Sequence, residues 1–107
     1  MLRRNEEGLK IKAEVFKAMG HPIRLGIIEL LRNGELCVCD IVQRVGTGIS
    51  NVSKHLSMLK KAGIVGDRRD GLRIMYRLVM PCACDFCRCL EGQDPDDLNG
   101  HSRVIAV

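Results

Sequence analysis

The sequence predicts a mainly α-helical protein with a small β-hairpin, built as one domain that forms dimers. Three observations lead to this expectation. The chain has 107 residues, which suits a single domain. Hydrophobic residues make up 46% of it, a globular composition, and they recur at helical spacing over most of the chain. Between residues 64 and 79 the period changes from 3.6 to 2, around an Asp70-Gly71 pair that is typical of a hairpin turn.

The first expected helix covers about residues 6–19 and has two apolar faces. Leu9, Ala13 and Phe16 share one face, and Ile11, Val15, Ala18 and Met19 share the other. A terminal helix needs only one apolar face to join its own core. We therefore expect the second face to pack against a partner subunit in a homodimer.

Four more elements with clear boundaries follow. Pro22 suits the first position of a second helix, which Asn33-Gly34 ends. A third helix is expected at 38–45 and a fourth from 49 or 50 to 62, with two strands at 64–69 and 72–79. A last helix runs from 81 to about 92. Residues 1–92 thus form the expected domain, and 93–107 a flexible tail.

The fourth helix has the most informative pattern. Its expected inner stripe is Ile49, Val52, Leu56 and Leu59. The outer face holds short hydrogen-bonding groups and cations without one acid, and such a face can enter a major groove. Together with the following hairpin, this order of elements predicts a winged helix-turn-helix that binds double-stranded DNA. The residues expected to contact DNA are Ser50, Asn51, Ser53, Lys54, His55, Ser57, Lys60, Arg68, Arg69 and Arg73.

Charge is concentrated in the same segment. The chain carries a net charge of +4, whereas residues 50–77 hold seven basic and two acidic side chains. A local basic surface favours a polyanionic partner. The alternative, a solvated charged face without a partner, is the more usual explanation of a charge run taken alone.

Six cysteines lie in two dense clusters. No apolar segment is long enough for a membrane span, and the N-terminus lacks the apolar stretch of a signal peptide, so a cytoplasmic location is expected. In a reducing cytosol, closely spaced cysteines favour metal binding or redox chemistry over structural disulfides. A disulfide between two cysteines separated by one residue is expected to be strained. The clusters are Cys37-x-Cys39 and Cys82-x-Cys84-x-x-Cys87-x-Cys89.

Several short motifs, in order, resemble the ArsR/SmtB family of metalloregulatory repressors over about residues 9–80. The motifs are Gly20-His21-Pro22-Ile23-Arg24-Leu25, Glu35-Leu36-Cys37-Val38-Cys39-Asp40-Ile41, Val52-Ser53-Lys54-His55-Leu56-Ser57-Met58-Leu59, Ala62-Gly63-Ile64-Val65 and Tyr76-Arg77-Leu78. The resemblance implies a homodimer that binds palindromic operator DNA and dissociates when an ion binds. It also implies Cys37 and Cys39 as ligands of arsenite or of another thiophilic ion, such as antimonite, cadmium, lead, mercury or zinc.

The family's arsenite sensors carry a third cysteine further along the same helix, and this chain continues there with Ile41-Val42-Gln43-Arg44. Arsenite takes three sulfurs, so we expect a trithiolate completed by Cys82, Cys84, Cys87 or Cys89. In a regular helix, residues i and i+2 lie about 200° apart. Cys37 and Cys39 are thus expected to share an ion only if the helix start is distorted, and the helix N-terminus favours their thiolate form.

The last helix offers a second candidate site. Cys84 and Cys87 are i, i+3 neighbours, whereas Cys82 and Cys89 lie on the other face, about 10 Å apart along the axis. The three histidines and three of the methionines are expected to have other roles. His21 caps a helix, His55 packs or touches phosphate, and His101 is inert; Met58, Met75 and Met80 are core residues.

Two alternatives to ion-responsive repression stay open. One is a repressor on the same fold whose thiols form disulfides or persulfides. The other is a cysteine-rich protein of metal trafficking or storage, which the basic fourth helix argues against. The chain has no phosphate-binding glycine-rich loop and no paired acid–base constellation, so we expect no enzyme and no organic cofactor.

Overall fold

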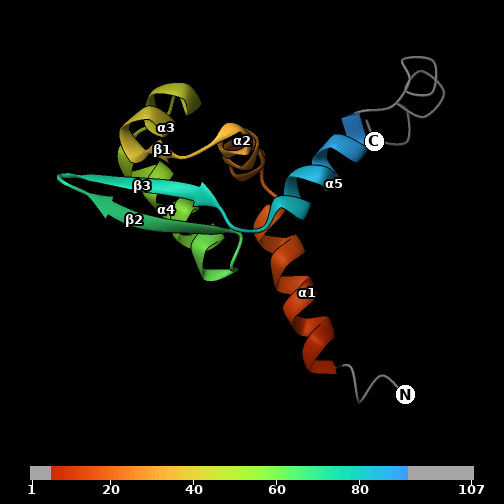
Figure 1. Ribbon diagram of the computed structural model, residues 1–107. Helices are drawn as coiled ribbons and strands as arrows, with labels where there is room; N and C mark the ends of the chain where they lie inside the picture. Colours follow the sequence, from red (N-terminus) through yellow and green to blue (C-terminus); the bar gives the residue numbers. More distant parts are fainter. Residues whose placement is uncertain (1–5, 92–107) are drawn as a thin grey trace.

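The computed structural model describes residues 6–91, and the expected tail at 93–107 lies outside them. Five helices surround a three-stranded antiparallel sheet in the order β1-β3-β2. Figure 1 shows the β2–β3 hairpin projecting beside α3 and α4, while α1 and α5 lie at the opposite end. None of the helices within these residues is long and apolar enough to cross a membrane. The elements are α1 (Glu6–Met19), α2 (Pro22–Leu30), a 3-10 turn (Leu31–Asn33), β1 (Leu36–Cys37), α3 (Val38–Val45), α4 (Ile49–Lys61), β2 (Val65–Asp70), β3 (Arg73–Leu78) and α5 (Pro81–Glu91).

Most expected helix boundaries are confirmed, and the caps explain them. His21 has an extended backbone and its Nδ1 accepts a hydrogen bond from the Ile23 amide at 3.1 Å, so it caps α2 as expected. Gly46, at φ 81°, ends α3 in the left-handed conformation that glycine adopts without a steric penalty. The winged helix-turn-helix arrangement of α2, α3, α4 and hairpin is therefore confirmed.

Two details of the sheet differ from the expectation. The hairpin turn consists of Gly71-Leu72, because Asp70 still pairs with Arg73, and Gly71 takes the positive φ of 64°. The two-residue strand β1 was not expected, since so short a segment has no readable period. Leu36 pairs with Tyr76, and Cys37 pairs with Met75.

The core lies between α2, α3, α4 and the start of β2. Its centre is formed by aliphatic side chains with 0% exposure: Ile27, Ile28, Ile41, Val52, Leu56, Leu59 and Ile64. Two expectations about α4 are wrong. Ile49 is 58% exposed, because it stands at the first position of the helix, beyond the core, and Met58 is 50% exposed beside Arg24.

Truncation in this core tests the packing of α4. We expect Leu56→Ala to lower the free energy of unfolding by about 2–5 kcal/mol, because a fully buried leucine leaves a cavity. Urea unfolding at a fixed protein concentration measures it. Ser57→Ala, one residue further and exposed, should change stability by less than about 0.5 kcal/mol. Equal effects of the two substitutions would contradict this orientation of α4.

Candidate metal centre and nucleic-acid interface

Two sulfur atoms and a carboxylate meet at the start of α3. One ligand atom from each of Cys37, Cys39 and Asp40 lies within 4.8 Å of the others. Cys37 is 1% exposed, whereas Cys39 is exposed on the surface. The group thus has a buried sulfur and an accessible one, a donor set that suits a thiophilic ion.

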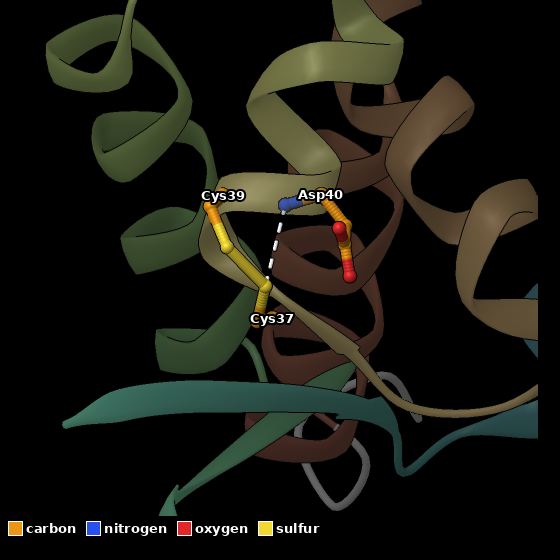
Figure 2. The surroundings of a disulfide bond; sticks show 3 residues. All are labelled: Cys37, Cys39 and Asp40. Carbon is orange, nitrogen blue, oxygen red and sulfur yellow. Dashed lines mark hydrogen bonds between the residues drawn. A yellow bond between two sulfur atoms is a disulfide. The ribbon is translucent and has the colours of Figure 1, made fainter. Parts of the chain in front are cut away.

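The expected strain at this pair of cysteines is not found. Cys37 and Cys39 are joined by a disulfide with a Cα–Cα distance of 5.4 Å, inside the usual range for such bonds (Figure 2). The physical reason is that Cys37 is not a helical residue. It is the N-cap of α3, with φ −76° and ψ 159°, so the chain bends between the two cysteines. The 200° separation of a regular helix therefore does not apply, and the sulfurs meet without distorting α3.

The N-terminus of α3 acts directly on the buried sulfur. The backbone amide of Asp40 donates a hydrogen bond to Cys37 Sγ at 3.4 Å (Figure 2). The positive end of the helix dipole points the same way. Both interactions favour negative charge on this sulfur, as the sequence predicted for a thiolate ligand.

The cysteines of α5 are divided by burial. Cys84 is 3% and Cys87 6% exposed, and both belong to the hydrophobic core, while Cys82 and Cys89 are exposed. Burial raises the pKa of the Cys87 thiol, and negative charge at Glu29 adds to this effect. A raised pKa disfavours the thiolate that binds metal. Within residues 6–91 of one chain, no α5 cysteine joins the Cys37–Cys39–Asp40 group.

The outer face of α4 presents the expected polar groups. Ser50, Ser53, Lys54 and Ser57 are exposed. Asn51 is half-buried and its Nδ2 donates to Thr47 Oγ1 at 3.2 Å. Thr47, which the sequence analysis did not single out, therefore orients a residue expected to read bases.

His55 is the exception on this helix. It is 9% exposed and its Nδ1 lies 3.1 Å from a guanidinium nitrogen of Arg24, while its ring lies 4.5 Å from that of His21. Burial lowers the pKa of His55, and positive charge at His21 and Arg24 lowers it further. A neutral His55 accepts a hydrogen bond from Arg24, so it holds α4 against α2. The expected phosphate contact of His55 is wrong, because the ring points inward, and its expected packing role is confirmed.

Arg24 is a functional residue that the sequence analysis missed. It is 9% exposed, and its guanidinium also donates to the carbonyl of Ala18 and to Met58 Sδ. Arg24 thus connects α1, α2 and α4. The signal that could have revealed it is a single arginine in an otherwise apolar helix segment.

The basic residues of the hairpin fall into two groups. Arg68 binds both carboxylate oxygens of Glu35 at 2.8 Å, and Lys60 of α4 binds Asp67 at 3.0 Å. Arg69 and Arg73 are exposed near the turn and make no ion pair within the described part of the chain. The accessible cationic groups of the hairpin are therefore those closest to its tip.

Comparison with known proteins agrees with this geometry. The family model "Bacterial regulatory protein, arsR family" matches residues 21–66. The chain is 47% identical over 68 residues to an uncharacterized HTH-type transcriptional regulator of Methanocaldococcus jannaschii, covering 63% of this chain and 76% of that protein. It is 39% identical over 66 residues to the arsenical resistance operon repressor of Escherichia coli, covering 61% of this chain and 56% of that repressor.

A solved structure shares the fold and a related sequence. It is a homodimeric winged helix-turn-helix DNA-binding domain of Mycobacterium bovis, described as a possible ArsR-family transcriptional regulator. The TM-score is 0.77 at 29% identity, over 92% of this chain and 90% of that one. With its thiol group, its helix-turn-helix and these relatives, the chain belongs to the ArsR family of transcriptional repressors.

Proposed function

We propose that this protein binds operator DNA as a homodimer and releases it when the thiols of Cys37 and Cys39 bind arsenite or another thiophilic ion. The observation that carries the proposal is the group of two sulfurs and the Asp40 carboxylate within 4.8 Å. It stands where β1 ends and α3 begins, and α3 leads through a three-residue turn into α4. The relative that represses an arsenical resistance operon supports arsenite as the ion.

The third sulfur of an arsenite site would come from the exposed part of the C-terminal cluster. Cys84 and Cys87 are committed to the core, whereas Cys82 and Cys89 face solvent. Since no α5 cysteine reaches the group within one chain, the exposed α5 cysteine that completes the trithiolate would belong to the second subunit.

The homodimer is supported by apolar side chains that one chain leaves exposed. Phe16 and Phe86 meet edge to face, with ring centroids 5.8 Å apart, yet they are 58% and 46% exposed. Leu9, Ile11 and Leu90 continue this surface along α1 and α5 with exposures of 44% to 64%. A cluster of this kind marks an interface.

DNA binding would place α4 in the major groove and the hairpin along the backbone. The exposed serines and Lys54 offer donors for base edges and phosphates. Arg69 and Arg73 would bind phosphates beside the groove.

A second candidate function is control by oxidation, which the Cys37–Cys39 disulfide favours. In that reaction hydrogen peroxide takes two electrons and two protons from the two thiols, and a disulfide and two water molecules form. The same two residues would then respond without any ion.

A titration separates the two effectors. The reduced protein is bound to its own upstream promoter DNA, and fluorescence anisotropy follows release as arsenite is added without oxidant. We expect release at one arsenite per site and its loss in Cys39→Ser, whose exposed position keeps the fold intact. Cys37→Ser should behave alike. Release by peroxide alone would assign the site to redox control, and indifference to both would contradict a thiol-controlled repressor.

Substitution at the hairpin tip tests the phosphate contacts. We expect Arg73→Ala to weaken binding to all DNA sequences and to reduce the salt slope of log K by about 0.9, the value for one phosphate contact. Anisotropy at several salt concentrations measures it. Lys10→Ala removes an equally exposed cation from α1 and should leave the slope unchanged. A wild-type slope in Arg73→Ala would remove this residue from the interface.

Asn51 gives the complementary test on sequence reading. We expect Asn51→Ala to reduce the ratio of operator to non-specific affinity by about 10-fold, as for a lost base contact of 1–3 kcal/mol, with little change in the salt slope. Thr47→Val should act in the same direction, because it removes the acceptor that orients Asn51. Equal weakening on operator and random DNA would mean that Asn51 only positions the helix.

A further inference from the structure

We propose that the ion pair between Glu35 and Arg68 transmits changes at the thiol group to the β2–β3 hairpin. The inference rests on the proposed thiol-controlled repressor and identifies a positioning residue for it. Glu35 lies two residues before Cys37, and Arg68 lies in the far strand of the sheet. The pair therefore spans from the segment that carries the sensor to the strand that carries the hairpin arginines.

The sheet register provides the first half of this connection. Cys37 pairs with Met75 of β3, and Met75 pairs on its other side with Arg68 of β2. The buried sulfur and Arg68 thus stand in one row across three strands. In the next row, Leu36 pairs with Tyr76, which pairs with Asp67. Any displacement of the two residues of β1 acts on the backbone of β3 directly.

The ion pair provides the second half. Arg68 donates from Nε and from a terminal nitrogen to the two oxygens of Glu35, each at 2.8 Å, in the planar arrangement that fixes direction as well as distance. The Arg68 hydrogen bond lowers the pKa of Glu35, so the pair stays charged at neutral pH. Its side chains are 49% and 30% exposed, and exposed pairs contribute little to stability. A defined geometry with little effect on stability indicates a positional role.

The adjacent residue of β2 is tied to the recognition helix. Lys60 of α4 lies 3.0 Å from Asp67, which precedes Arg68. Consecutive residues of β2 are thus held by the sensor segment and by α4. When thiol chemistry moves residues 35–37, the Glu35–Arg68 pair would shift the hairpin relative to α4, and both must fit the DNA together.

The same arrangement reassigns a residue. Arg68 was expected to contact DNA, but its guanidinium is occupied by Glu35. Arg69 and Arg73 remain for phosphates, and Arg68 acts inside the protein to place them.

The experiment measures the release factor, defined as the DNA dissociation constant with saturating arsenite divided by that of the reduced protein alone. Glu35→Gln keeps the size of the side chain and removes its charge. We expect its release factor to be at least about five-fold smaller than that of wild type, the lower end of usual allosteric coupling. Arsenite should still bind with the wild-type stoichiometry. Glu7→Gln, which removes the exposed Glu7–Lys10 pair of α1, is the matched control and should keep the wild-type factor.

A double-mutant cycle separates a link from a structural effect. If the pair acts as one unit, Glu35→Gln/Arg68→Gln loses no more of the release factor than either single variant. A wild-type release factor in Glu35→Gln, or additive losses in the double variant, would overturn this inference alone. Absence of release by arsenite in the wild-type protein would overturn the proposed function together with it.

Discussion

The burial of one face of α4 is the constraint on which the rest of the molecule depends. Val52, Leu56 and Leu59 have no exposed surface, so the helix cannot rotate without opening the core. Its serines and lysines are outward for that reason, and the hydrogen bond from Arg24 to His55 adds a polar contact at the same interface. Packing between α2 and α4 thereby decides which atoms of the protein are offered to DNA.

A second constraint is the double membership of Cys37. One residue ends strand β1 and caps helix α3, so its backbone belongs to the sheet while its sulfur belongs to the helix start. Chemistry at the sulfur consequently cannot be confined to one element. The Glu35–Arg68 and Lys60–Asp67 pairs extend the same connection to the hairpin and back to α4.

Elements with a long period could be predicted from the sequence. The helices, the hairpin and the polar face of α4 each repeat a local pattern several times. Features that depend on contacts between distant segments could not be predicted. Strand β1 exists because β3 pairs with it, and Glu35, 33 positions before Arg68, has no sequence signal of its partner. The idea that Cys37 and Cys39 must diverge failed because it assumed a helical Cys37, whereas the strand ends there.

The unequal exposure of Cys37 and Cys39 has a consequence for timing. A reagent from solution meets Cys39 first, and only then closes a ring with the buried Cys37. The second bond forms within one molecule, at a high effective concentration, so a ligand that loses one sulfur is recaptured before it departs. Such a chelate assembles at a rate governed by the outer thiol and dissociates at one governed by both. The gene under its control would respond quickly to exposure and recover slowly after it, a short chemical memory written into two neighbouring side chains.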